Sequence, residues 1–198
     1  MVESIQKKTL PERESSYRIE VSQEELGKFL IPTISEDEVR KFLDKFKEKY
    51  KGKHKKALFI ARMQPPHFGH LLAMKMALEV ADNLVIGIGS SNVKGLDNPW
   101  TVEERQDMLE KALETNTDIK TRSRIIHLPD FFVSKDEYDD PKWVEETLQR
   151  VEGADVVVSR NPWVTGLLDG KMNIIKPPLF KREYFEGKKI RQALRNRK

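Results

Sequence analysis

The sequence predicts an α/β protein with a doubly wound, parallel, five-stranded sheet and a small N-terminal α/β appendage. Three observations favour this class. Short apolar runs, several of them rich in β-branched residues, recur from residue 57 onward. Stretches with one apolar helical face lie between several of these runs, and alternating strands and helices imply right-handed crossovers and parallel strands. The length of 198 residues suits one such domain with an appendage.

The chain divides into an N-terminal extension, residues 1–55, and a main domain, residues 56–198. The extension opens with a polar segment that we expect to be poorly ordered. Residues 17–21 alternate apolar and polar side chains, as a short strand does. Residues 35–50 repeat apolar side chains at helical spacing, and the basic stretch 51–56 is typical of a connector. We assign no chemistry to this extension.

The predicted strands of the main domain are continuous apolar runs. Such runs are typical of strands that are buried on both faces, as in parallel sheets with helices on either side. Ligands of doubly wound sheets bind at the carboxyl ends of the strands, where the strand order reverses. The five runs lie within residues 57–61, 83–90, 124–130, 154–161 and 172–178.

Three helices are predicted between these strands. The first follows His70 and carries apolar side chains on one face as far as Ala81. The second begins at Thr101, which forms a capping-box pattern with Glu104. The third begins near Asp140, where an acidic residue followed by proline favours a helix start.

Composition narrows the class of protein. The sequence contains no cysteine, which excludes disulfides, thiolate zinc sites and cysteine nucleophiles. No apolar run approaches the ~18 residues that a membrane span needs, and the N-terminus is too polar for a secretory signal. We therefore expect a soluble, cytoplasmic protein. The net charge of +4 suits anionic ligands but is too small to imply nucleic acid.

The stretch ARMQPPHFGH, residues 61–70, carries the candidate chemistry. It leaves the first strand of the sheet and enters the first helix. Gly69 lets a ligand approach the backbone, and the start of the helix presents free N–H groups and a positive dipole end. His67 and His70 add hydrogen-bond donors, and Arg62 adds a positive charge. Together these groups would hold a polyphosphate.

Other interpretations of this stretch are less favoured. It matches neither the P-loop pattern nor the GxGxxG fingerprint of dinucleotide-binding folds. Each histidine alone is as easily a helix cap or a satisfied polar group as a ligand. A metal site using His67 and His70 would need further ligands, and no carboxylate accompanies the pair locally.

Four segments in order carry a family resemblance. ARMQPPHFGH resembles the GRxQPxHxGH motif of archaeal-type nicotinamide mononucleotide adenylyltransferases, a branch of the HxGH nucleotidyltransferase superfamily. Residues 88–109 are similar to the family's IGS…NPFTAGER segment, and SRNP at 159–162 resembles its SGNP turn. Residues 176–191 are similar to its final PPxF…SGTxIR segment. The resemblance covers about residues 57–195 and implies a Rossmann-like nucleotidyltransferase fold.

The resemblance implies a reaction. The 5′-phosphate of nicotinamide mononucleotide attacks the α-phosphorus of ATP, pyrophosphate leaves and NAD forms. The nucleophile is already an anion, so catalysis reduces to alignment and charge neutralisation. By resemblance, His67 and His70 would donate to the phosphates, and Arg62 and Arg191 would supply charge. Mg²⁺ would enter bound to ATP oxygens, without a metal site formed by the protein.

The resemblance also assigns binding residues. A tryptophan on the segment of Trp143 stacks on the nicotinamide ring in the family, although spacing alone favours core packing for Trp143. The remaining candidates for the acceptor are Trp100 and Asn98, and Trp100 and Trp163 could equally belong to the core. The ATP-binding candidates are Ala61, Met63, Gln64, Gly69, Arg160, Asn161 and Lys188.

One departure from the family pattern concerns the last motif, Ser-x-Thr-x-x-Arg, which holds the triphosphate. The aligned residues here are Glu186, Lys188 and Arg191, so the arginine is retained and both hydroxyls are absent. Lys188 or Lys189 would replace a hydroxyl donor with a charge, whereas Glu186 would repel phosphate unless it points away or binds a cation.

Two alternative functions follow from the same residues. One is a related transferase with another phosphate acceptor, and the other is a non-catalytic nucleotide- or RNA-binding protein. The basic C-terminal segment 188–198 is more typical of a solvated helix face than of a nucleic-acid site. By analogy with the family, a homo-oligomer is possible, and we expect no membrane partner.

Overall fold

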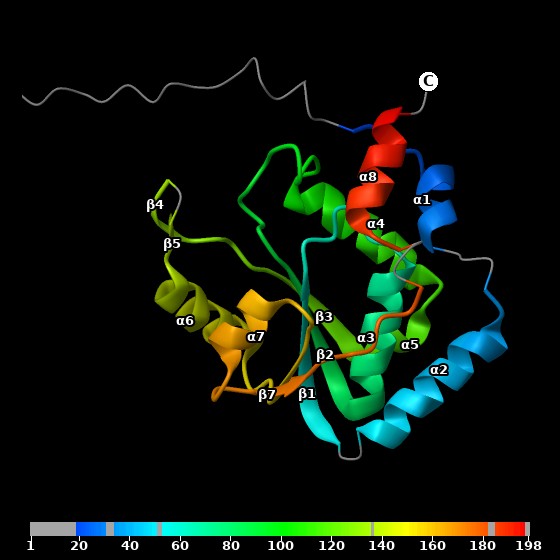
Figure 1. The fold of residues 1–198 in the computed structure, drawn as a ribbon, viewed down its shortest axis with the longest axis horizontal. Coiled ribbons are helices and arrows are strands. Elements are labelled where there is room, and N and C mark those ends of the chain that lie inside the picture. The colour runs from blue at the N-terminus through cyan, green and yellow to red at the C-terminus, as the bar shows by residue number, and fades with distance from the viewer. Residues whose placement is uncertain (1–18, 31–33, 51–52, 136, 182–184, 197–198) are drawn as a thin grey trace, which may run out of the picture.

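The computed structural model describes residues 19–30, 34–50, 53–135, 137–181 and 185–196. Its centre is a five-stranded sheet in the order β3-β2-β1-β6-β7, with every neighbouring pair parallel (Figure 1). This confirms the predicted doubly wound α/β class. The strands are β1 (His54–Ala61), β2 (Ala81–Ile88), β3 (Ser123–His127), β6 (Val156–Val158) and β7 (Asn173–Ile175).

Helices cover both faces of the sheet (Figure 1). On one face lie α3 (Phe68–Val80), α4 (Val102–Glu114) and α5 (Thr117–Arg122), and α2 (Glu36–Lys49) packs on the outside of α3. On the other face lie α6 (Asp140–Val151) and α7 (Pro162–Leu168). Side chains alternate along β1 to serve both layers. Ala57 and Phe59 belong to the first core, whereas Leu58 belongs to the second.

The strand order reverses at β1. The chain moves from β1 to β2 and β3 on one side, then returns to place β6 and β7 on the other. A crevice therefore opens outside the carboxyl ends of β1 and β6. The segment after β1 is ARMQPPHFGH, and the segment after β6 begins with Ser159. The topology brings these two motifs together.

The predicted helices form, with shifted ends. Helix α3 begins at Phe68 with His67 as its N-cap, two residues earlier than the sequence pattern indicated. Ala81, predicted on that helix, instead begins β2, because the chain passes from α3 into the strand without a loop. Helix α4 starts with the expected capping box between Thr101 and Glu104.

The N-terminal extension differs from the prediction. Of the predicted strand 17–21, residues 19–21 form no strand and residues 17 and 18 lie outside the described residues; α1 (Gln23–Leu30) follows instead. Residues 54–56 of the predicted connector belong to β1. Helix α2 forms as expected, with the Ser35 side chain accepting from the Glu38 N–H. The polar start, residues 1–18, lies outside the described residues.

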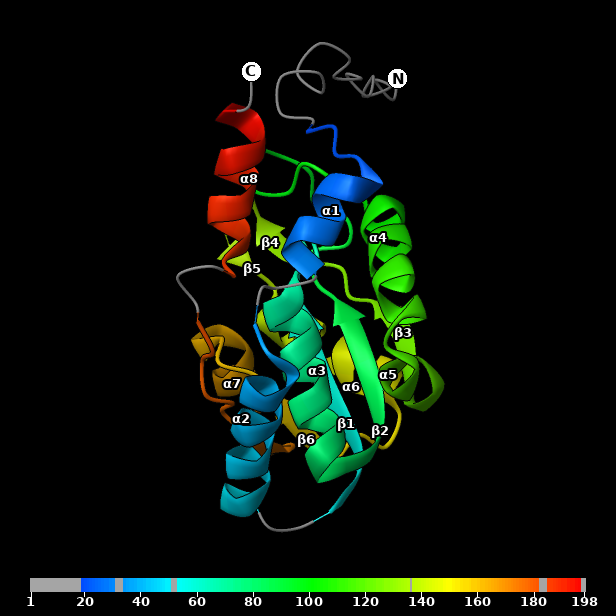
Figure 2. The same ribbon diagram turned by 90° about the vertical axis from the view of Figure 1, so that its right-hand side faces the viewer.

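Helix α8 (Gly187–Asn196) closes the fold beside α1 (Figure 2). The sequence pattern indicated a solvated basic helix, but Ile190, Arg191 and Leu194 are buried. A short hairpin of β4 (Phe132–Ser134) and β5 (Glu137–Tyr138) projects above α6 (Figure 1). Among the described residues, no helix has both the length and the apolar character of a membrane span.

Candidate nucleotide site

The histidine pair lies at the corner between β1 and α3. The His67 and His70 rings stack, with centroids 3.7 Å apart and planes inclined by 23°. The carbonyl of His67 accepts from the His70 N–H at 2.8 Å, which fixes the first helical turn. A Cβ at Gly69 would lie 3.1 Å from the His67 ring and 3.3 Å from Phe185, so glycine makes this stacking possible. The two imidazoles are therefore held side by side at the crevice.

Both imidazoles are neutral near pH 7. Burial lowers the pKa of His67 from 6.5 to about 4. Burial, together with the nearby His67, places the pKa of His70 well below 6.5. The Nδ1 atoms of both rings are buried and have no hydrogen-bond partner among the described residues. Polar atoms in this state are unusual in folded proteins and point to a ligand that supplies the missing partner.

A cavity of about 610 Å³ opens on one side of the histidine pair. Polar groups from both motifs line it, and a wall of aromatic and aliphatic side chains completes it. A cavity of this size and character can take a nucleoside. Its lining includes Ala61, His67, Gly69, His70, Ser159, Arg160 and Asn161 from the motifs, and Phe59, Leu72, Met76, Pro177, Phe180 and Phe185 from the wall.

A second cavity, of about 370 Å³, shares His67 and His70 with the first and has a charged lining. The first turn of α8 faces it with Gly187 and Lys188, so the N-terminal ends of α3 and α8 converge there. Such helix ends favour anions. The other lining residues are Arg62, Met63, Gln64, Asp97, Glu186 and Arg191.

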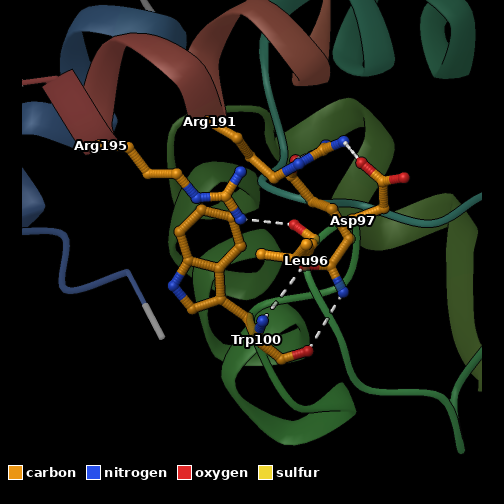
Figure 3. A network of polar contacts seen from close by, with 6 residues as sticks. Leu96, Asp97, Trp100, Arg191 and Arg195 are labelled. Carbon is orange, nitrogen blue, oxygen red and sulfur yellow. Dashed lines mark hydrogen bonds and ion pairs between the residues drawn. The ribbon is translucent and has the colours of Figure 1, made fainter. Parts of the chain in front are cut away.

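Arg191 is buried between two partners in this second cavity (Figure 3). It donates from Nη1 to the Gln64 carbonyl at 2.8 Å and from Nη2 to Asp97 Oδ1 at 3.0 Å. Its Nε is buried without a partner in the described part of the chain. The hydrogen bond from Arg191 lowers the pKa of Asp97 below its usual value. The cavity therefore has an anchored cation beside a carboxylate.

Comparison with known proteins agrees with this geometry. A family model described as cytidylyltransferase-like matches residues 58–193. The chain belongs to the cytidylyltransferase-like family. It is 36% identical over 141 residues to a nicotinamide-nucleotide adenylyltransferase from Ignicoccus hospitalis, which covers 70% of this chain and 79% of the relative. A relative of the same name from Thermococcus kodakarensis is 32% identical, over 71% of this chain and 72% of its own.

A solved structure supports the same fold. The crystal structure of a bifunctional NMN adenylyltransferase/ADP ribose pyrophosphatase from Francisella tularensis superimposes with a TM-score of 0.61 and 25% sequence identity. The match covers 71% of this chain and 42% of the larger one. The archaeal relatives and this structure together confirm the family resemblance that the four sequence motifs indicated.

Gln64 and Met63, two predicted ATP-binding residues of the family motif, have side chains that already make contacts within the protein. The Gln64 amide pairs with the backbone of Trp100, donating to its carbonyl at 3.1 Å and accepting from its N–H at 3.3 Å. Met63 has a positive φ of 52° and packs in the first core. These side chains shape the corner. Any contact of Met63 or Gln64 with ATP would therefore come from those of their atoms that line the second cavity.

Trp100 lies elsewhere than the family resemblance implied. It is only 2% exposed, and its indole Nε1 donates to the Ile19 carbonyl at 2.8 Å. It packs with residues of α4 and α8 and does not line either cavity. Asn98 is also buried and outside both linings, and its backbone pairs with Gly95. We therefore do not propose that Trp100 contacts the acceptor. The Asn98 Oδ1 is buried without a partner among the described residues, so the contact of Asn98 with the acceptor stays a prediction.

Trp143 is buried in the second core, 3% exposed, beneath Trp163. The two indole rings have centroids 4.6 Å apart and are tilted by 56°. Trp163 in turn donates from Nε1 to Asp140 and contacts the ring of Tyr138. Trp143 lines neither of the two cavities, so the core interpretation describes this structure.

Arg160 and Asn161 lie where the family motif predicts, at the carboxyl end of β6. Both line the larger cavity. The Arg160 guanidinium donates to the Pro177 carbonyl at 3.1 Å, and the Asn161 side chain accepts from the Trp163 N–H as the N-cap of α7. Both residues therefore stabilise the loops at this end of the sheet and line the larger cavity.

Sequence analysis did not identify Arg105 as a residue of the site. Arg105 is fully buried and donates to the carbonyls of Arg62, Gly89 and Ser90 at 2.7 to 3.2 Å. These acceptors follow β1 and β2, so one guanidinium ties the loops of the site together. Arg105 is the last residue of the NPWTVEER segment, and this position in a family motif was the signal that could have indicated its role.

The buried histidines make stability depend on pH. Unfolded His67 binds a proton near pH 6.5, whereas folded His67 does so only at about 4. Stability is therefore lost as pH falls through this window. At about pH 5 we expect His67 to account for a loss of about 2 kcal/mol in the free energy of unfolding, measured by urea denaturation. His67→Asn, which cannot titrate, should lose that much less; an unchanged pH dependence would contradict the assignment.

Proposed function

We propose that this chain transfers the adenylyl group of ATP to nicotinamide mononucleotide, forming NAD and pyrophosphate. The single observation that carries this proposal is the stacked histidine pair between a nucleoside-sized cavity and a cationic cavity, with both Nδ1 atoms lacking a partner in the described part of the chain. The names of the archaeal relatives support it. Adenosine would occupy the larger cavity, and the phosphates of ATP would extend past His67 and His70 towards Lys188 and Arg191.

The residues present suit a reaction that needs alignment and charge neutralisation. A neutral imidazole donates one N–H, and the lowered pKa values keep both histidines neutral near pH 7. The acceptor phosphate is already anionic, so the site needs no general base. His67 and His70 would donate to the phosphate oxygens, and the charge that develops in the transition state would be met by Arg62 and Arg191.

Lys188 would take the place of the hydroxyl donors that the family motif carries. It lies in the first turn of α8 and borders the cationic cavity. An ammonium group binds phosphate as a point charge and without fixed geometry. Glu186 stands directly before the helix, and its carbonyl accepts from the Ile190 N–H. The helix start is thus formed, although the hydroxyls are absent.

Mg²⁺ fits this arrangement as a companion of ATP. Asp97 offers a hard carboxylate oxygen beside the phosphate space, which suits this cation. When bound, Mg²⁺ would neutralise phosphate charge. The protein's own part is to hold the phosphates in line and to keep cationic groups near the leaving pyrophosphate.

The proposal is tested by product analysis. Purified full-length protein is incubated with ATP, Mg²⁺ and one of several acceptors: nicotinamide mononucleotide, its deamido form, flavin mononucleotide or phosphopantetheine. We expect pyrophosphate release with formation of NAD, and loss of activity when the metal is chelated. Another dinucleotide product would select a different acceptor, and nucleotide binding without pyrophosphate would show a non-catalytic relative. Either result would overturn the proposal.

A further inference from the structure

The N-terminal extension contacts the helix that carries part of the phosphate site. Residues 19–30 lie outside the stretch 58–193 that the family model covers. In the structure α1 lies between α4 and α8 (Figure 2). We propose that this segment, with Ile19 as its key residue, positions α8 for binding the triphosphate of ATP. This inference rests on the proposed function.

An apolar cluster anchors α8 to the extension. The buried apolar side chains of α8 are Ile190 and Leu194, and both belong to a third cluster with Ile19, Trp100 and Met108. Val21, Phe29 and Leu30 pack against this cluster from the extension. Three side chains form the centre of this cluster: Ile19 of the extension, Trp100 of the loop before α4, and Ile190 of α8. Each is at most 5% exposed. Loss of the extension would expose one side of α8.

Polar contacts connect Trp100, a member of this cluster, to Arg191, which lines the second cavity (Figure 3). Trp100 donates from its indole to the Ile19 carbonyl at 2.8 Å, and its backbone pairs with the Gln64 side chain. The Gln64 carbonyl then accepts from Arg191 at 2.8 Å. The path from the extension to the buried guanidinium therefore runs through Trp100 and Gln64, all of it fixed by hydrogen bonds.

A second connection fixes the loop opposite α8. Arg195, one turn after Arg191, donates to the Leu96 carbonyl, and Arg191 binds the adjacent Asp97 (Figure 3). Helix α8 thus holds the 95–98 turn with two arginines while its apolar side rests on Ile19. The orientation of the N-terminal end of α8, which carries Lys188, depends on the arginine contacts to the turn and on the apolar contacts to the extension. Ile19 is a positioning residue, because it shares an apolar cluster with Ile190 and Leu194 of α8 and lines neither cavity.

The expected effect is a loss of affinity for polyphosphate. When a binding-competent placement of α8 is populated only a tenth of the time, the apparent affinity falls about tenfold. The loss should concern groups bound by α8, namely the outer phosphates, and spare the nucleoside and the acceptor. A purely structural role would instead lower stability and leave the ratio of these affinities unchanged.

The experiment compares full-length variants by calorimetric titration with inorganic triphosphate and with AMP, and by the KM values for ATP and nicotinamide mononucleotide. Ile19→Ala and Trp100→Phe remove the apolar contact and the indole hydrogen bond. Ile19→Val provides a milder change if Ile19→Ala does not fold. Val39→Ala is the matched control, because Val39 lies in the same extension but packs on the first core through α2.

We expect triphosphate affinity to fall about tenfold in Ile19→Ala and by less in Trp100→Phe, with AMP affinity and the KM for the acceptor unchanged. Val39→Ala should retain the affinity of the unmodified protein. Unchanged triphosphate affinity in the Ile19 variants, or an equal loss in Val39→Ala, would overturn the inference. Failure of the unmodified protein to form NAD would instead count against the proposed function, since triphosphate binding is measured separately.

Discussion

Replacement of His70 by alanine is expected to lower kcat for NAD formation roughly 30- to 1,000-fold. His70 stacks on His67 at the junction of the two cavities, and the Nδ1 atom of each ring has no hydrogen-bond partner within the described residues. Loss of one donor to a developing phosphate charge costs about 2 to 4 kcal/mol of transition-state stabilisation. Steady-state kinetics with saturating ATP and acceptor measure the effect.

Two further variants separate donation from other roles of His70. His70→Gln keeps a neutral N–H donor and should recover part of the lost activity, whereas a general base would not be replaced by an amide. His54→Ala is the matched control, since His54 lies at the opposite end of β1 and pairs with Asp155. Near-normal turnover in His70→Ala, or an equal loss in His54→Ala, would refute the assignment of His70.

Replacement of Arg105 by leucine is expected to lower the free energy of unfolding by about 3 to 5 kcal/mol. The Arg105 guanidinium is fully buried and also donates from Nε to the Thr101 carbonyl at 3.1 Å. Burial lowers its pKa to about 10, so it remains charged near pH 7. Leucine would leave several carbonyls after β1 and β2 without donors, and each buried unsatisfied group costs about 1 to 3 kcal/mol. Chemical denaturation measures the loss.

The Arg105 substitution should also raise the KM for ATP, because its acceptors include the carbonyl of Arg62. Arg122→Leu serves as the control. Arg122 donates to the carbonyls of Leu78, Ala81 and Asp82, but it is half-buried and lies at the amino ends of β2 and β3, away from the site. Because Arg122 is only half-buried, its removal lets water replace part of these hydrogen bonds, so we expect a smaller loss, about 1 kcal/mol, and an unchanged KM for ATP. Equal losses in the two variants would contradict the special role of Arg105.

The pattern of residues along the chain predicted the parts of the protein that depend on neighbours in sequence. Apolar runs predicted all five strands, since a strand buried on both faces must be apolar throughout. The capping box at Thr101 marked the start of α4 for a similarly local reason. His67, Gly69 and His70 came together as predicted, because a strand-to-helix corner and one helical turn fix their spacing.

Local pattern was a poor guide where distant segments meet. Trp100 was assigned to the acceptor from its motif, yet its environment is built by Ile19 and by Ile190, far from it in both directions along the chain. The basic helix α8 looked solvated for the same reason. Its few apolar residues find partners in Trp100 and Met108 and in the N-terminal extension, all of them distant in sequence.

The sequence alone therefore determined the fold class and the stacked histidine pair at the strand-to-helix corner, because these follow from periodicity, topology and contacts within a single turn. The tertiary structure decided which polar groups form hydrogen bonds within the protein. Gln64 and Arg191 bind each other, and Trp100 binds the extension, through hydrogen bonds between residues that only folding brings within 3 Å. No spacing rule along the chain encodes such pairings.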